Sequence, residues 1–176
     1  MDVPTYSETL FITDAAINIF PDLEVKRDII QNAIDLFTQV GLGTPRVAIL
    51  SAVETVTPKI PSTIEAAALC KMADRGQITG GVLDGPLAFD NAIDPEAARI
   101  KGIKSPVAGR AQILIVPDLE AGNMVWLHGY LTGRNGPAVG KLTRDWISTQ
   151  VTRLGKECAA AANPATTRLV DLVQKS

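Results

Sequence analysis

Short apolar runs alternate along this chain with longer segments in which apolar residues recur every three or four positions. The short runs cover residues 9–12, 46–51, 80–83 and 112–116 and predict buried strands. The longer segments predict helices, of which 22–40 has the most regular spacing, followed by 62–75 and 94–102. Since consecutive parallel strands need a crossover of this kind, we expect an α/β fold with a layered, mostly parallel sheet flanked by helices.

Capping residues support these helix boundaries. Asp22 follows Pro21, Asp94 precedes Pro95, and Asp118 follows the run that ends at residue 116, so each aspartate is expected to cap a helix. Ser62 and Glu65 stand in a capping-box pattern at the start of 62–75. Residues 124–131 can continue the helix that follows Asp118.

Residues 84–123 concentrate polar and turn-forming residues directly after short apolar runs. Asp84, Gly85 and Pro86 are expected to form a turn after the strand at 80–83. Loops that leave the carboxyl ends of strands are where α/β proteins place their ligands. We therefore expect the functional site in this stretch.

Two segments have residues suited to bind an anion. Lys59 lies just before the helix at 62–75, whose free N–H groups favour negative charge, although an ordinary capped helix with an exposed lysine fits the same pattern. Residues 105–110 combine Ser105, a proline, Gly109 and Arg110, and arginine suits phosphate or carboxylate. A plain turn is the alternative for this second segment.

Composition narrows the class of protein. The 176 residues are 46% hydrophobic and only 5% aromatic, so the core is expected to consist of aliphatic side chains. A net charge of −2 gives no reason to expect nucleic acid or an acidic membrane as a partner. No apolar run approaches the ~18 residues of a membrane span, and the first residues lack the basic start of a signal peptide. We expect a cytoplasmic protein with reduced cysteines.

Charge divides the chain into two parts. Residues 134–176 hold seven basic and three acidic residues, a net of +4, whereas the other residues have a net of −6. Apolar spacing in this basic tail predicts helices over 141–162 and 169–173. We therefore expect an α/β domain over residues 1–133 and a helical tail of different origin over 134–176.

Few residues of this sequence suggest a catalytic nucleophile, a catalytic base or a metal site. The single histidine, His128, lies in an apolar helical context typical of a packed or surface residue, and no cluster has the spacing of zinc ligands. Cys70 and Cys158 lie in helical segments without a neighbouring base, so both are expected to be structural. The glycines match neither the G-x-G-x-x-G fingerprint of dinucleotide-binding domains nor the G-x-x-x-x-G-K-[ST] fingerprint of phosphate-binding loops. No metal site is expected.

Three ordered motifs point to a family. Residues 84–90 (DGPLAFD), 105–111 (SPVAGRA) and 117–123 (PDLEAGN) resemble the phosphate acetyl/butyryltransferase family, and the likeness extends over about residues 8–133. It is strongest to the phosphotransacetylase part of bacterial proteins that also carry an enoyl-CoA hydratase-like segment.

The resemblance implies a reaction and a set of residues. It implies acyl transfer, acetyl or another short acyl group, between coenzyme A and inorganic phosphate, on a two-domain fold akin to isocitrate dehydrogenases and usually in a homodimer, with coenzyme A as substrate and no cofactor. It places Ser105 and Arg110 near the phosphate and acyl pocket, and gives Asp84, Asp90 and Asn123 a part in shaping the cleft.

Two departures from the family pattern leave a second hypothesis open. About half of a full-length family member has no counterpart in this sequence, and a Ser-Arg/Asp loop with catalytic functions is represented only by the weak candidates Arg144 and Asp145. The chain is therefore expected to be either a phosphate acyltransferase or an inactive fragment that binds only coenzyme A or phosphate.

Overall fold

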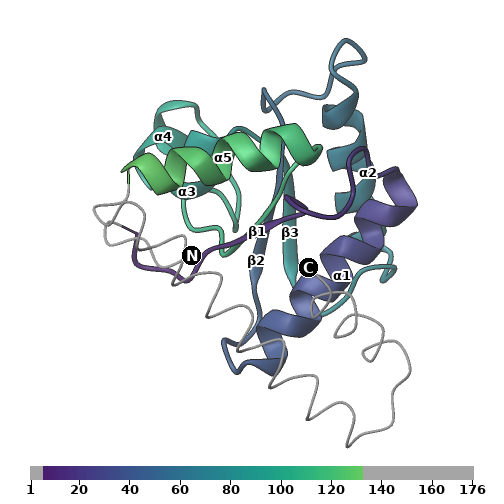
Figure 1. Ribbon diagram of the computed structural model, residues 1–176. Coiled ribbons are helices and arrows are strands. Elements are labelled where there is room, and N and C mark those ends of the chain that lie inside the picture. The colour runs from purple at the N-terminus through teal and green to yellow at the C-terminus, as the bar shows by residue number, and fades with distance from the viewer. Residues whose placement is uncertain (1–5, 133–176) are drawn as a thin grey trace, which may run out of the picture. The chain divides into compact units, whose positions relative to one another are not determined.

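A four-stranded parallel sheet forms the centre of the domain (Figure 1). The computed structural model describes the backbone of residues 6–132 and the side chains of residues 6–125. The strands are β1 (Phe11–Thr13), β2 (Arg46–Leu50), β3 (Val82–Leu87) and β4 (Ile113–Ile115), and their order in the sheet is β1-β4-β2-β3. Every pair of neighbours is parallel, which confirms the predicted α/β fold.

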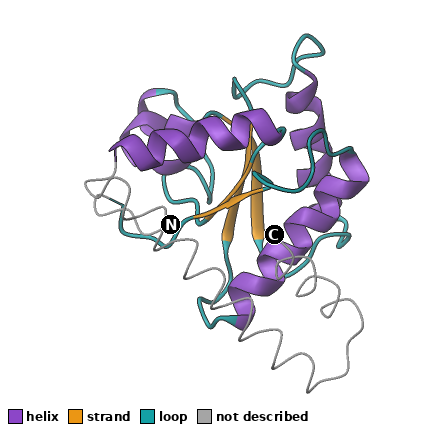
Figure 2. Ribbon diagram, in the orientation of Figure 1, coloured by secondary structure: helices purple, strands orange, loops and turns teal. Residues whose placement is uncertain are grey.

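Helices cover both faces of this sheet (Figure 2). Those described are α1 (Leu23–Gln39), α2 (Pro61–Asp74), α3 (Phe89–Ile93), α4 (Pro95–Ile100) and α5 (Leu119–Thr132). One apolar cluster joins α1 and α2 to the sheet through residues such as Phe37, Leu69 and Ile115. A second cluster covers the opposite face with α3, α4 and the segment 103–111, and Ala121 of α5 packs against it. The result is a three-layer α/β/α unit.

The predicted aspartate caps are confirmed. Asp22 accepts a hydrogen bond from the Val25 N–H at 2.9 Å, and Asp94 accepts one from the Glu96 N–H at 2.8 Å. Asp118 accepts from the Ala121 N–H at 2.8 Å at the start of α5. Each carboxylate satisfies an N–H group that the first helical turn leaves without a partner.

The predicted capping box at α2 is wrong. The helix begins at Pro61, and its cap residue, Ile60, makes no side-chain capping bond. Ser62 is therefore already inside the helix, and its hydroxyl lies 2.8 Å from that of Ser51 at the end of β2. Glu65 pairs with Lys26 of α1. Both side chains that the local pattern assigned to a cap are instead bonded to residues distant in the sequence.

The predicted turn at residues 84–86 is also wrong. Strand β3 runs through Asp84, Gly85 and Pro86 to Leu87, with Ala48 opposite Asp84 and Leu50 opposite Leu87. The Gly85–Pro86 peptide bond is cis, and the register between β2 and β3 shifts between Ala48 and Leu50. The proline lies in a strand at the edge of the sheet, where a missing N–H is tolerated.

Some predictions fall outside the described residues. The basic tail, its two predicted helices and the domain boundary after residue 133 are among them, and so are Arg144, Asp145 and Cys158. Within the part of the chain that the structure describes, no helix has the length and apolar character needed to cross a membrane.

Candidate functional site

The carboxyl ends of β2 and β4 meet at a crevice in the sheet. From the end of β2 the chain enters α2, which packs on one face, whereas from the end of β4 it enters α5, which packs on the other. Adjacent parallel strands whose connections leave in opposite directions open a crevice between their carboxyl ends. Ligands of open α/β sheets bind at such points.

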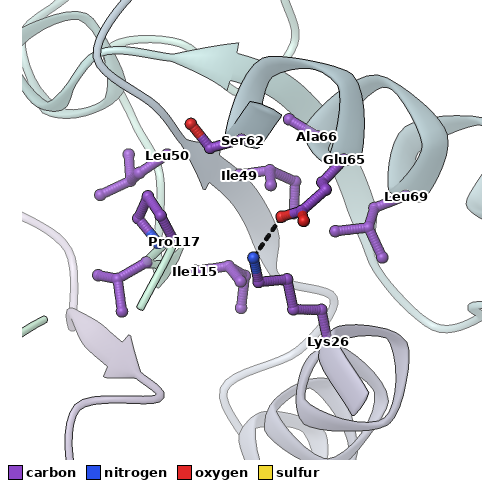
Figure 3. Close-up of a pocket in the computed structure, with 10 residues that line it drawn as sticks. Lys26, Ile49, Leu50, Ser62, Glu65, Ala66, Leu69, Ile115 and Pro117 are labelled. Carbon is purple, nitrogen blue, oxygen red and sulfur yellow. Dashed lines mark hydrogen bonds and ion pairs between the residues drawn. The ribbon is translucent and has the colours of Figure 1, made fainter. Parts of the chain in front are cut away.

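A small pocket lies at this crevice, between α1, α2 and the two strand ends (Figure 3). Most of its lining is aliphatic, and three polar side chains, Lys26, Ser62 and Glu65, interrupt it. The remaining lining residues are Ile49, Leu50, Ala66, Leu69, Ile115, Val116 and Pro117. The pocket has a cavity volume of about 10 Å³, which is room for about one water molecule or one methyl group.

Lys26 is the buried cation of this pocket. Its side chain is only 7% exposed, and its ammonium forms an ion pair with the Glu65 carboxylate, which is 34% exposed (Figure 3). Ser62 lies one helical turn before Glu65, and its hydroxyl bonds that of Ser51. A buried lysine is rarely tolerated without such a partner, so the pair compensates the desolvated charge.

A second polar cluster lies near the carboxyl ends of β2 and β3. Asn91 is fully buried, and its amide donates to the Glu54 carboxylate. The Lys101 ammonium donates to Glu54 at 2.8 Å, to Asp90 at 3.3 Å and to the side-chain oxygen of Asn91 at 3.3 Å. The cluster ties together the loop after β2, helix α3 and the end of α4.

Charge pairing sets the protonation of this cluster. The hydrogen bond from Lys101 is the main cause that lowers the pKa of Glu54, and the bond to Glu54 in turn raises that of Lys101. Burial would raise the pKa of Asp90, but hydrogen bonds from Lys101 and from the Asn91 N–H together lower it. All three groups therefore stay charged at neutral pH.

Asp14 shapes the loop that leaves β1. Its carboxylate accepts hydrogen bonds from the N–H groups of Ala16 and Ile17, both at 3.0 Å, and from the N–H and side-chain amide of Asn18 at 2.8 and 2.6 Å. Burial would raise the pKa of Asp14, but these donors together lower it. The carboxylate is thus engaged in folding its own loop.

The segment with Ser105 and Arg110 precedes a strand instead of following one. Ser105 accepts hydrogen bonds from the N–H groups of Val107 and Ala108, both at 3.0 Å, which makes a local turn. The Arg110 carbonyl accepts from the Nε of Arg46, the first residue of β2, at 2.7 Å. The backbone of Arg110 therefore lies at the amino-terminal edge of the sheet, and the five residues of β2 separate the two edges by about 13 Å.

The other predicted binding residues are spread over the domain. Asp84 lies within β3, and one of its oxygens accepts from the Gly85 N–H at 2.8 Å. Asp90 belongs to the cluster around Lys101. Asn123 is exposed on α5, where its amide donates to the Leu119 carbonyl, and Lys59 is exposed in the loop before α2.

No hydrogen bond or ion pair among the described residues joins any two of the six predicted binding residues. Sequence reasoning also missed the residues that the fold does bring together, namely Lys26 with Glu65 and Asn91 with Glu54. The partners of the first pair are 39 residues apart in the chain and those of the second pair 37, so no local pattern indicates them. A signal was present only in Lys26, a charged residue on the otherwise apolar face of a helix.

The remaining candidates for chemistry are few. Cys70 is partly buried in α2, its thiol lies 3.7 Å from the Gly85 carbonyl, and burial followed by the charges of Asp84 and Asp74 raises its pKa to about 12. It therefore lacks thiolate character. The side chain of His128 lies outside the described residues. Within the described part of the chain, no group of three or more potential ligands could hold a metal ion.

The geometry defines a class before it defines a family. A parallel three-layer α/β unit with a crevice at the carboxyl ends of β2 and β4 belongs to the class of open α/β domains, whose ligands bind at the carboxyl ends of the strands. Residues 1–138 match the model of the phosphate acetyl/butaryl transferase family, and the chain belongs to that family.

Several relatives show the same likeness. A phosphate acetyltransferase of Rhizobium meliloti is 85% identical over 125 residues, which are 71% of this chain and 40% of that protein. A branched-chain phosphotransacylase from Enterococcus faecalis V583 has a similar structure, with a TM-score of 0.68 and 33% identity over 75% of this chain and 47% of that one. The chain thus spans less than half the length of either relative.

A longer alignment extends into the basic tail. A phosphate butyryltransferase of Clostridium acetobutylicum is 39% identical over 90% of this chain and 56% of its own length. An aligned stretch of that length includes residues beyond 133. The likeness to the family is therefore not confined to residues 8–133, and the separate origin of the tail stays a prediction.

Proposed function

We propose that this chain carries substrate-binding residues of a phosphate acyltransferase, which transfers an acetyl or other short acyl group between coenzyme A and inorganic phosphate. The observation that carries this proposal is the family match over residues 1–138, which includes all six predicted binding residues. The crevice at the carboxyl ends of β2 and β4 gives a substrate a place to bind.

The reaction depends on placing the two substrates next to each other and on stabilising the negative charge that develops between them. A base takes the thiol proton of coenzyme A, and the thiolate attacks the carbonyl carbon of the acyl phosphate. The carbon–sulfur bond forms, the carbon–oxygen bond to phosphate breaks, and phosphate leaves with the electron pair. Cationic and N–H groups stabilise the oxyanion that forms in between. No metal or other cofactor takes part in this proposal.

Two of the six predicted binding residues are cations that could bind the phosphate groups of these substrates. Within the described residues, the side chains of Arg110 and Lys59 make no hydrogen bond or ion pair, so both are available to a ligand. They belong to opposite edges of the sheet. We assign Arg110, with Ser105, to a phosphate of coenzyme A, and Lys59 to the acyl phosphate. Asp84, Asp90 and Asn123 would shape the surrounding surface.

Assembly and location belong to the same proposal. We infer a homodimer from the resemblance to the family. Because coenzyme A and acyl phosphates are metabolites of the cell interior, we place the reaction in the cytoplasm. Neither nucleic acid nor membrane is expected as a partner, and the net charge of −2 supports this.

One observation favours a second candidate. The chain spans only 40% of the Rhizobium meliloti relative, so that protein has residues with no counterpart here. If those residues supply the catalytic groups, this chain binds coenzyme A or phosphate without turning them over.

A single assay separates the two candidates. Purified protein is mixed with acetyl phosphate and coenzyme A, acetyl-CoA is measured by thioester absorbance and mass spectrometry, and coenzyme A binding is measured by calorimetry. Turnover is the expected result for the acyltransferase. Binding without turnover supports the binding fragment, and the absence of both binding and turnover overturns both candidates.

A further inference from the structure

The pocket between α1 and α2 contains a cation that the proposed function has not used. Lys26 is 5% exposed as a residue, and its only hydrogen-bond partner among the described residues is Glu65. An ammonium group has three N–H donors, so two of them have no protein acceptor in the described part of the chain. The remaining wall of the pocket is aliphatic apart from Ser62. An incoming oxygen acceptor would therefore find donors that are already desolvated.

The charge of the pocket selects the kind of acceptor. Glu65 neutralises Lys26, so a free anion would meet a carboxylate as well as an ammonium. A neutral carbonyl oxygen can accept from the ammonium without disturbing the pair. A methyl-sized group attached to that carbonyl fits the space of about 10 Å³ between Ile49, Leu69 and Ile115. A carbonyl with a methyl group is an acetyl group.

We propose that the Lys26–Glu65 pocket is the subsite for the short acyl group of the substrate, with the acyl methyl between the aliphatic side chains and the carbonyl oxygen accepting a hydrogen bond from the Lys26 ammonium. This inference rests on the proposed function. Lys59 is exposed in the loop between β2 and α2, three residues before Ser62, and we assign it to the phosphate end of the acyl phosphate. Arg110, whose backbone lies at the opposite edge, cannot serve the same acyl phosphate.

The size of the pocket implies a preference for acetyl over longer chains. Leu69 and Ala66, both fully buried, line the pocket from α2, and Ile115 lines it from the sheet. Further methylene groups would have to displace these side chains. Discrimination between short apolar chains in a pocket of this kind is about 10-fold or more.

The test measures binding directly and does not depend on turnover. The full chain, labelled at isoleucine and leucine methyl groups, is titrated by NMR in separate experiments with acetyl phosphate, butyryl phosphate, inorganic phosphate and coenzyme A. Acetyl phosphate should shift the Ile49, Leu69 and Ile115 methyl signals saturably, and inorganic phosphate should not. Butyryl phosphate should bind about 10-fold more weakly than acetyl phosphate.

Variants then assign the roles of the residues. Lys26→Met should weaken the binding of acetyl phosphate about 10-fold or more, because a hydrogen bond from a charged donor is lost. Lys71→Met is the matched control, since Lys71 lies on the exposed side of α2 in a pair with Asp74. This variant should bind acetyl phosphate with the affinity of the unaltered chain. If Lys26→Met fails to fold, Lys26→Met/Glu65→Met replaces the whole pair by apolar side chains. Leu69→Ala, or the milder Ile49→Val, should reduce the preference for acetyl over butyryl.

Each outcome decides between the two levels of the proposal. Pocket methyl shifts that need about 10-fold more acetyl phosphate, or are lost, in Lys26→Met and are unchanged in Lys71→Met support the subsite. Acetyl phosphate binding that shifts only methyl signals elsewhere, or that Lys26→Met leaves unchanged, overturns the subsite and leaves the proposed function standing. If neither acetyl phosphate nor coenzyme A shifts any signal, the proposed function fails and the subsite with it.

Discussion

At the scale of single residues, Arg110 combines a fixed backbone with a free side chain. Its carbonyl accepts from Arg46 at 2.7 Å, and its N–H donates to the Val107 carbonyl at 3.1 Å. The guanidinium is exposed and makes no hydrogen bond or ion pair with the described residues. A cation held in this way loses little entropy in its backbone when it binds an anion.

Arg110→Ala should therefore weaken the binding of coenzyme A without unfolding the protein. The loss of a charge-assisted hydrogen bond predicts a decrease of ~1–3 kcal/mol in binding free energy, measured by calorimetry. Arg27→Ala, which removes an exposed arginine of α1, is the matched control. Equal coenzyme A affinity in the two variants would remove Arg110 from the site.

Asp14 makes a prediction about pH. Its folded-state pKa lies below the unfolded-state value of about 3.9, because four donors to the carboxylate outweigh the effect of burial. A group of this kind contributes stability at every pH above its unfolded-state pKa, and the contribution is lost as the pH falls through the folded-state pKa.

Asp14→Asn should lower the free energy of unfolding at pH 7, since an amide cannot accept all four hydrogen bonds. The difference from the unaltered chain should shrink once the pH falls below about 4, where the carboxylate begins to protonate. Urea unfolding between pH 3 and 7 measures it, with Glu24→Gln as a variant that removes an exposed carboxylate from the first turn of α1. A difference that stays constant over this range would refute the assignment.

At the scale of elements, the segment before β4 depends on a close contact with α4. Gly109 has a φ of +79°, and a Cβ added there would lie 2.5 Å from the Cα of Pro95. Its N–H also donates to the Asn91 carbonyl at 2.7 Å. Only glycine fits both the backbone conformation and the space, so this residue sets the path of the chain into Arg110.

Gly109→Ala should destabilise the protein more than Gly102→Ala. Gly102 also has a positive φ, +68°, but a Cβ there meets nothing within 4 Å. Both variants carry the cost of a left-handed alanine, about 1 kcal/mol, so the difference isolates the clash with Pro95. We expect that difference to be about 1–3 kcal/mol, the range for overpacking, in urea unfolding. Equal decreases in the free energy of unfolding for the two variants would show that α4 can shift away from residue 109 without cost.

The elements also show why part of the fold was predictable. Strands and long helices follow from the spacing of apolar residues, and the caps at Asp22, Asp94 and Asp118 follow from chemistry within one turn. The errors arose where distant partners decided the outcome. Ser62 bonds Ser51 instead of capping α2, and Pro86 continues β3 beside β2. The five-residue helix α3, Phe89–Ile93, is too short to show a period and was not predicted.

At the scale of the whole molecule, motifs that are consecutive in the sequence need not form one site. The three family motifs lie on β3 and α3, on the segment before β4, and at the start of α5. The segment that carries Arg110 leads into β4 and is bonded to the first residue of β2, so it lies at the amino-terminal edge of the sheet. The pocket with Lys26 lies at the other edge.

Two separated sites predict additive stabilisation by two ligands. A ligand that binds only the folded state adds RT ln(1 + [L]/Kd) to the free energy of unfolding, about 2.7 kcal/mol at 100 times Kd. Desulfo-coenzyme A has no thiol and cannot consume acetyl phosphate, so it takes the place of coenzyme A in this measurement. Together with acetyl phosphate it should stabilise the chain by about the sum of the two separate effects, measured by urea unfolding at saturating ligand. Arg110→Ala should reduce only the part due to desulfo-coenzyme A, and Lys26→Met only the part due to acetyl phosphate, because additivity holds for groups more than about 10 Å apart. If either variant reduced both parts equally, the two ligands would share one site and the division of the sheet into two binding edges would be wrong.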